Sequence, residues 1–407
     1  MKKNFMLFRT ILPFAILSLA IAFSSCEKDT IKQETTVPEA PEQPTLNALN
    51  IEVTDGILAF QSLEDFATAM KAISGLSRDE KEAWAQQLNF QSLSARLRSI
   101  QDQIDAQPDI PGKTHLTAGE KELFSFEDDG TLVSHGPDLL LSELITPEGL
   151  VYIEGALNSF GDDYHAIVKE EPTIAKMNTL LAQAASSPEQ EMYFFSRPIR
   201  KEIVDYNDLA KESKFFPCPL FDRGVNIWGH RKEENIGGQR QRLRVELSQA
   251  IYHFGGTDNR VFSYVSMMIE NRKRSGWSWI RTFPDYEYGT LAWLNGGPAT
   301  SGETSSSSVV QSLRVDRDIR VTLSNGGNQI LRTDVNVVPD PTGWSFDISR
   351  FGDADEYYLI DNVISRAILS PGVSIVSSGG EYGFSRGKIS VNWLNRSSTM
   401  DIQLGCQ

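Results

Sequence analysis

The second half of the chain alternates apolar and polar residues, and this pattern constrains the fold more than any other feature. Residues 243–248, 319–323 and 389–393 each alternate in this way. A period of two places one class of side chain on each face of a β-strand. Glycine-rich turn signals separate the runs at 255–256, 295–297, 325–327 and 379–380. Short alternating strands divided by such turns predict an antiparallel β-sandwich over residues 216–407.

The preceding region, residues 51–215, carries the signals of helices. Ser62-Leu63-Glu64-Asp65 and Ser77-Arg78-Asp79-Glu80 are capping patterns in front of apolar residues at helical spacing. Ser92 opens a third segment of the same kind, and a further helix is expected after Pro172. The predicted fold class is therefore α+β, with a small, mainly helical N-terminal part followed by a C-terminal antiparallel β-sandwich.

The first residues read as a lipoprotein signal peptide over residues 1–25. Basic residues precede an apolar run from Ile11 to Phe23, and two serines lead into Cys26. This order is typical of a secretory signal, and it makes Cys26 the predicted lipid-attachment residue. Residues 26–50 contain three prolines among Glu, Gln and Thr, which predicts an extended tether. Acyl chains would then hold the protein to a membrane.

The net charge of −15 is concentrated in the first half of the chain. Residues 51–200 contain 11 basic and 25 acidic residues, whereas residues 201–407 contain 23 and 24. An acidic surface repels nucleic acid and anionic lipid, so we expect neither as a partner of this half.

Two cysteines remain if Cys26 carries lipid. Cys218 and Cys406 would lie in an oxidising compartment, where disulfides persist. We expect them to form a disulfide; the alternative is two buried free thiols.

Three segments near the N-terminus carry a family resemblance. They are Cys26-Glu27-Lys28-Asp29, residues 57–66 (ILAFQSLEDF) and residues 75–84 (GLSRDEKEAW). They resemble uncharacterised cell-envelope lipoproteins of Bacteroidetes, a family of unknown function. The resemblance implies an outer-membrane location with display on the cell surface, where acidic residues follow the lipidated cysteine. It implies no known activity.

No sequence motif identifies a catalytic or metal site. Gly383-Phe384-Ser385-Arg386-Gly387 matches a nucleophile pattern, but no histidine follows it, and we interpret it as a hairpin turn. The five histidines lack the spacing of zinc ligands. Asp162-Asp163-Tyr164-His165 follows a glycine and is interpreted as a solvated turn, with metal binding as its alternative. Asp353-Ala354-Asp355-Glu356 resembles the start of a calcium loop, but Tyr358 stands where an EF-hand needs glycine, which leaves a calcium site of another kind as the alternative. We therefore predict no metal and no cofactor.

Aromatic residues give the leading functional hypothesis. Six of the seven tryptophans lie beyond residue 215. Trp277 and Trp279 share one face of a strand, and Tyr286 and Tyr288 repeat this spacing. Four such rings could form a flat platform on which a sugar ring stacks, although they could equally fill the sandwich core.

The expected function is therefore non-catalytic binding of a glycan or of a host or envelope polymer at the cell surface. One alternative is a glycan hydrolase with two paired carboxylates. The other is an adhesin or envelope-assembly subunit that pairs an edge strand with a partner. The basic stretch Arg231–Arg244 is expected to form a solvated strand edge, with binding of an anionic sugar or peptide as its alternative.

Overall fold

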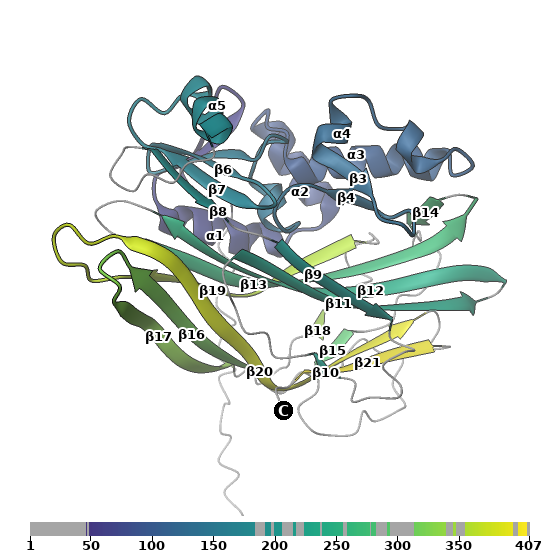
Figure 1. Ribbon diagram of the computed structural model, residues 1–407. Coiled ribbons are helices and arrows are strands. Elements are labelled where there is room, and N and C mark those ends of the chain that lie inside the picture. Colours follow the sequence, from purple (N-terminus) through teal and green to yellow (C-terminus); the bar gives the residue numbers. More distant parts are fainter. Residues whose placement is uncertain are drawn as a thin grey trace, which may run out of the picture. The chain divides into compact units, whose positions relative to one another are not determined.

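The computed structural model divides the chain into two compact units, residues 1–42 and 43–407. The described residues all belong to the second unit; they are residues 46, 49–183, 192–196, 199–205, 215–216, 224–236, 238–254, 259–276, 278–281, 291–293, 313–338, 345–346, 355–393 and 398–404. They combine a few helices with many strands, most of them antiparallel (Figure 1).

The described α-helices all lie before residue 184. They are α1 (Leu63–Ser74), α2 (Arg78–Gln87), α3 (Leu93–Ala106), α4 (Glu120–Leu123) and α5 (Ile174–Gln183). None of them is long and apolar enough to cross a membrane.

Serine caps start the first three helices where the sequence predicts them. The Ser62 hydroxyl accepts a hydrogen bond from the Asp65 amide at 3.0 Å. Ser77 and Glu80 form a complete capping box, which satisfies two amides that the first helical turn leaves unpaired. Ser92 caps α3 in the same way. The predicted apolar face of α1 is buried as well.

A six-stranded sheet also lies in the N-terminal region, where the sequence predicts mainly helices. Its order is β1-β2-β5-β6-β7-β8, and β2 and β5 are the parallel pair. The strands are β1 (Ile51–Thr54), β2 (Ile57–Phe60), β5 (Leu150–Ile153), β6 (Ala156–Phe160), β7 (Tyr164–Val168) and β8 (Met192–Ser196). Several have only four or five residues, too few for a clear alternating pattern. A separate hairpin consists of β3 (Phe124–Phe126) and β4 (Leu132–Ser134).

The second sheet is built on long strands. Its order is β14-β13-β12-β11-β9, and β19 pairs with β13 as well. Its strands are β9 (Ile199–Asp205), β11 (Gly224–Ile236), β12 (Gln239–Phe254), β13 (Arg260–Ser275), β14 (Ser278–Arg281) and β19 (Asp355–Arg366). The β9–β11 pair is parallel and the other pairs are antiparallel. Because β9 belongs to this sheet, the sheet begins before residue 216.

The remaining strands are joined through β20 (Ile375–Trp393). The first part of β20 pairs with β16, and its last part pairs with β15 and β21. The other strands are β10 (Phe215–Phe216), β15 (Leu291–Trp293), β16 (Leu313–Leu323), β17 (Asn328–Val338), β18 (Ser345–Phe346) and β21 (Ser398–Leu404).

Strand β20 corrects two predicted turns. Gly379-Gly380 and the Gly383–Gly387 segment both lie inside the strand. Gly379, Gly380, Gly383, Phe384 and Arg386 pair with β16, and Gly387 pairs with β21. The segment is therefore neither a hairpin turn nor the strand-to-helix elbow that a serine nucleophile needs. The turn at 325–327 is confirmed, because Gly326 has a φ of +81° between β16 and β17.

One large apolar core joins the N-terminal region to the second sheet. It contains Phe66 and Met70 of α1, Phe60 of β2, and Tyr252 of β12 and Phe262 of β13. The Phe66 ring meets the Phe60 and Phe262 rings edge to face at 5.3 and 6.0 Å. Burial of these side chains therefore ties residues before 216 to residues after it.

Candidate functional site

One face of β12 changes from charged to apolar along its length. The alternate residues from Ala250 to Phe254 lie in the shared apolar core. The alternate residues from Arg242 to Ser248 lie on the same face, and all are buried. The polar half faces the hairpin β3–β4, since Arg242 and Arg244 pair with Asp129 and Glu127.

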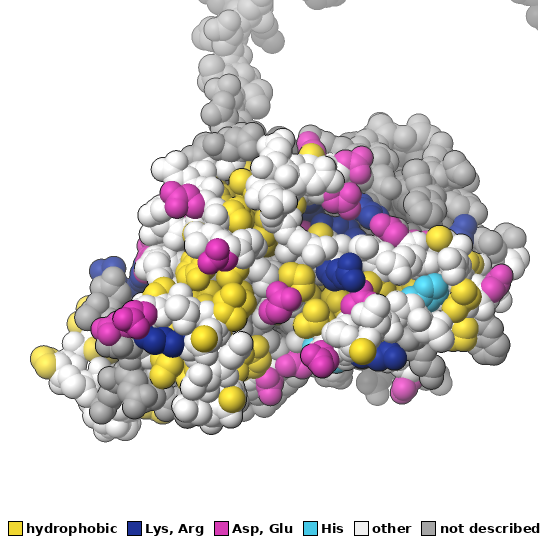
Figure 2. Space-filling model, turned by 90° about the horizontal axis from the view of Figure 1, so that it is seen from above, with side chains coloured by type: hydrophobic (Ala, Val, Ile, Leu, Met, Phe, Trp, Pro, Cys, Tyr) yellow, Lys and Arg dark blue, Asp and Glu magenta, His cyan; other side chains and the backbone are white. Residues whose placement is uncertain are grey.

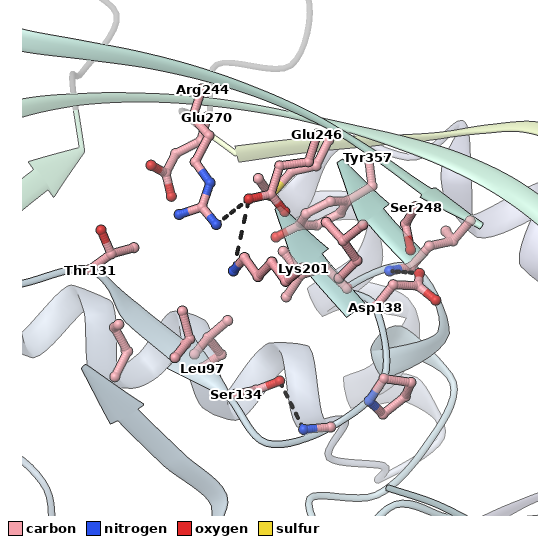
Figure 3. Close-up of a pocket in the computed structure, with 18 of the residues that line it drawn as sticks. Leu97, Thr131, Ser134, Asp138, Lys201, Arg244, Glu246, Ser248, Glu270 and Tyr357 are labelled. Carbon is pink, nitrogen blue, oxygen red and sulfur yellow. Dashed lines mark hydrogen bonds and ion pairs between the residues drawn. The ribbon is translucent and has the colours of Figure 1, made fainter. Parts of the chain in front are cut away.

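A cavity of about 280 Å³ lies beside this polar half. It is lined on one side by the sheet, with Arg244, Glu246 and Ser248 from β12, and on the other by α3 and residues 131–140. Figure 3 shows Arg244, Glu246 and Lys201 pointing toward one another across the top of the cavity. This volume is just below the range of about 300–1,000 Å³ that is common for small-molecule sites.

Ion pairs cover the sheet side of the cavity. Arg244 pairs with Glu246, and its Nη1 atom lies 3.3 Å from Glu127 Oε2. Lys201 Nζ lies 2.8 Å from Glu127 Oε1 and 3.9 Å from Glu246 Oε1. Burial alone would lower the pKa of Arg244, but the carboxylates of Glu246, Glu270 and Glu127 outweigh it and raise that pKa.

Glu270 is the most enclosed carboxylate of this wall. It lies directly opposite Arg244 in the β12–β13 register, and its Oε1 atom is 2.5 Å from Arg242 Nη2. Burial would raise its pKa, but Arg242, Arg272 and Arg244 together hold the pKa well below its ordinary value. Glu270 is therefore ionised at neutral pH.

The other side of the cavity is largely apolar. Leu97 of α3, Leu132 of β4 and Leu140 line it, and Tyr357 of β19 adds an aromatic ring. Polar residues line this side as well, among them Thr131, Ser134, Asp138 and Asp162. The Asp138 carboxylate accepts hydrogen bonds from the Tyr264 hydroxyl and, at 3.0 Å, from the Leu140 amide.

Several residues that line the cavity carry a buried polar atom without a hydrogen-bond partner among the described residues. Among these atoms are the hydroxyl of Ser248 and the Nε atom of Arg244, whose residues are 7% and 3% exposed. A buried unmade hydrogen bond costs about 1–3 kcal/mol, so such groups call for a partner from outside the protein.

The Lys201–Glu127 pair marks where the cavity meets solvent. Their side chains are 30% and 29% exposed, whereas Arg244 and Glu246 are 3% and 9% exposed.

Figure 2 shows the face of the molecule that lies at the top in Figure 1. Acidic and basic side chains are interspersed on it. Among the described side chains visible in this view, neither charge forms a patch of its own.

The hairpin β3–β4 is held over the sheet by Asp129. Its carboxylate contacts Arg231 Nη1 at 2.8 Å and Arg242 Nη1 at 2.9 Å. Burial would raise the pKa of Asp129, but the hydrogen bonds from Thr131 and the charges of Arg242 and Arg231 lower it. The carboxylate thus fixes the hairpin that forms one wall of the cavity.

The predicted solvated edge at Arg231–Arg244 is corrected by this arrangement. Strand β12 lies between β11 and β13, and Arg242 is fully buried. Arg242, Arg244 and Glu246 face charged partners, whereas the Arg240 side chain at the start of β12 is 61% exposed. A usable signal was present in the sequence, because Arg244 on one strand lies opposite Glu270 on the next.

The predicted aromatic platform is only partly described. Trp277, Tyr286 and Tyr288 lie outside the described residues. Trp279 is 4% exposed, its Nε1 atom donates to the Asp129 carbonyl oxygen at 3.1 Å, and the Arg242 guanidinium lies 4.6 Å from its ring centroid. This burial corrects the expectation that Trp279 presents its ring to a ligand; the ring helps to hold the hairpin.

The cysteines fall outside what the structure describes. Cys26, Cys218 and Cys406 all lie in undescribed segments, so lipid attachment and the disulfide stay predictions.

Within the described residues no three His, Cys, Asp or Glu side chains lie together as metal ligands would. His165, from the Asp162–His165 segment, is 1% exposed and stacks on Phe160 at 4.3 Å. It therefore points into the core, while Asp162 is exposed and lines the cavity.

Comparisons with known proteins give little further guidance. No protein-family model matches the chain, and no curated protein matches it. Among solved structures, a DUF4848 family protein from Bacteroides thetaiotaomicron VPI-5482 is similar at 10% identity with a TM-score of 0.25. The match covers 87% of this chain and 100% of that one. At this TM-score the likeness does not establish a common fold.

Proposed function

We propose that this chain is a lipid-anchored protein of the outer membrane, displayed on the cell surface, that binds a ligand without catalysis in the cavity under the hairpin β3–β4. The observation that carries the proposal is the cavity itself, in which the Ser248 hydroxyl and Arg244 Nε are buried without a hydrogen-bond partner among the described residues. Concave sites with an apolar wall and a few placed polar groups are the usual form of a ligand site.

The location in this proposal comes from the sequence. The signal-like start, Cys26 and the acidic residues after it support lipid anchoring and surface display. A protein held there meets glycans and the polymers of the envelope or of a host. We therefore propose one of these as the ligand, bound through a unit small enough for the cavity.

The proposal extends to the arrangement of the second half. We propose that the sheet built on β12 and the strands joined by β20 pack face to face as a β-sandwich. Contacts between β12 and β20 support this arrangement.

The state of Glu270 removes this residue as the general acid of a glycan hydrolase. A glycan hydrolase needs one carboxyl that is protonated at working pH, which requires a raised pKa. Arg242, Arg272 and Arg244 lower the pKa of Glu270, so this carboxylate cannot supply the proton.

A glycan array probed with the full chain tests the proposed function. The chain should be purified in a detergent without a sugar headgroup, so that the detergent does not compete. Three variants accompany it: Ser248→Leu, which fills the cavity; Trp277→Ala, which tests the aromatic platform; and Ser365→Ala, a control in β19 away from the cavity. Ser365 is 8% exposed, close to Ser248 at 7%. Thermal unfolding of each variant shows that it is folded.

We expect saturable binding that Ser248→Leu abolishes and that Ser365→Ala leaves unchanged. Loss of glycan binding in Trp277→Ala, together with full binding by Ser248→Leu, would place the site at the aromatic platform. It would refute the proposal that the cavity is the site. Absence of binding to every glycan on the array would refute the proposal that the ligand is a glycan. Release of reducing ends from a bound glycan would show that the chain is a hydrolase.

A further inference from the structure

The charges on the sheet side of the cavity are already matched, and this limits which ligand that side can accept. Near its sheet side lie three cations, Lys201, Arg244 and Arg272, and three carboxylates, Glu127, Glu246 and Glu270. A charged ligand would have to break one of these pairs or leave its own charge buried without a partner. Either outcome is costly in a site shielded from water.

A further carboxylate, that of Asp138, lies at the far end of the cavity and also has hydrogen-bond partners. Asp138 accepts hydrogen bonds from the Tyr264 hydroxyl and from the amides of Leu140 and Leu141, the last at 3.3 Å. It adds negative charge to the lining, which makes the entry of an anion still less favourable.

The unmade hydrogen bonds indicate the chemical groups of the ligand. Arg244 Nε can only donate, whereas the Ser248 hydroxyl can donate and accept. A hydroxyl of the ligand can pair with both groups. It accepts a hydrogen bond from Arg244 Nε, and it can donate to or accept from the Ser248 hydroxyl. An amide or a carboxylate of the ligand would pair less well with one of these two groups.

The apolar wall indicates the shape of the ligand. Leu97, Leu132 and Leu140 face the ion pairs across the cavity, beside the ring of Tyr357. A ring compound with C–H groups on its faces and hydroxyls around its rim presents apolar surface to such a wall and polar groups to the sheet.

We propose that the ligand of this cavity is an uncharged, hydroxyl-rich ring of about the size of one sugar residue, such as a neutral hexose unit. The inference rests on the proposed function and narrows it: it excludes uronic acids and amino sugars as the bound unit. Volume, charge balance and the two unmade hydrogen bonds carry it together.

Calorimetric titration of the full chain with matched sugars tests this inference. The probes are glucose, galactose and mannose, the uronate of each, which adds one carboxylate, and glucosamine, galactosamine and mannosamine, which each add one ammonium group. We expect at least one neutral hexose to bind saturably, with its uronate and its amine at least about tenfold weaker.

The variants Ser248→Ala and Ser365→Ala connect the binding to the cavity. Loss of one hydrogen bond should weaken the neutral hexose about five- to tenfold in Ser248→Ala, and Ser365→Ala should bind as the wild type does. Ser248→Ala removes a single oxygen, so the protein should stay folded, as its thermal unfolding would show.

The outcomes separate the inference from the proposed function. Binding of a uronate or amino sugar that equals or exceeds that of its neutral match would overturn the inference, and a loss of that binding in Ser248→Ala would leave the cavity as the site. Equal binding by wild type and Ser248→Ala would remove the cavity from both proposals. If no sugar binds while the array detects a polymer whose binding Ser248→Leu abolishes, the inference fails, whereas the proposed binding function stands.

Discussion

Replacing Asp129 by Asn should destabilise the protein through the loss of one carboxylate charge. The carboxylate contacts Arg242, whose side chain is fully buried, and Arg231, whose side chain is 30% exposed. Breaking a buried pair costs about 3–5 kcal/mol when the remaining charge has no other partner. Arg242 keeps Glu270 at 2.5 Å, so we expect a cost below this range, about 2–3 kcal/mol, including less than about 1 kcal/mol from the exposed pair.

This substitution leaves the backbone contacts of the hairpin in place. Trp279 and Arg274 both donate to the Asp129 carbonyl oxygen, at 3.1 and 3.2 Å, and an asparagine keeps that oxygen. Asp128→Asn is the matched control, because Asp128 is the exposed neighbour with the same charge. We expect the control to change the free energy of unfolding by less than about 0.5 kcal/mol.

Urea unfolding at pH 7 and at pH 3 measures the effect and its origin. The pKa of Asp129 is lower in the folded protein than its ordinary value. Its contribution is therefore present above the unfolded pKa of about 3.9 and is lost as the pH falls through the folded pKa. The difference between wild type and Asp129→Asn should thus shrink at pH 3. An equal difference at both pH values, or an effect no larger than that of Asp128→Asn, would refute the reasoning.

Two further results follow from burial and backbone geometry. Burial lowers the pKa of His230 to about 4 and, with the nearby positive charge of Lys169, that of His253 to about 3. The folded pKa values lie below the unfolded pKa of about 6.5, so the free energy of unfolding is highest above about pH 6.5. It decreases as the pH drops below this, by about 2 kcal/mol per histidine at pH 5. Urea unfolding at pH 7 and pH 5 should show that the free energy of unfolding decreases less in His230→Gln and in His253→Gln than in the wild type. A decrease equal to that of the wild type in both variants would contradict the lowered pKa values. Gly149→Ala should cost more than about 2 kcal/mol, because its φ is +80° and a Cβ atom would lie 2.3 Å from the Phe160 carbonyl oxygen. Gly56→Ala is the control, with a φ of +78° and no atom within 4 Å of the added carbon; similar melting temperatures for the two variants would rule out the clash.

The helices were predictable because their signals are local. A serine that caps an amide three residues ahead needs no distant partner, so Ser62, Ser77 and Ser92 identify the starts of α1, α2 and α3. Long strands such as β12 were predictable for a similar reason, since alternation over many residues leaves little ambiguity.

The cavity could not be predicted in the same way. Alternation along β12 gives two faces, but it does not say that the polar face is covered by a hairpin more than 100 residues earlier in the chain. Asp129 and Arg242 are 113 residues apart, and Tyr264 and Asp138 are 126 apart. A polar strand face normally meets water, so Arg242 and Arg244 read as solvated until the hairpin is placed over them.

The apolar core that joins α1 to β12, β13 and β19 also governs when the chain can fold during synthesis. The helices are made first, but Tyr357 and Leu359 of β19 belong to the same core, and Asn362 donates to the Ala67 carbonyl oxygen across 295 residues. The amino-terminal region therefore cannot complete this shared core until β19 has left the ribosome, although a smaller apolar cluster forms within residues 57–180 alone. For a protein whose first residues read as an export signal, late closure of the core would favour translocation, because the secretion channel takes extended chains and a domain that folded early would block it.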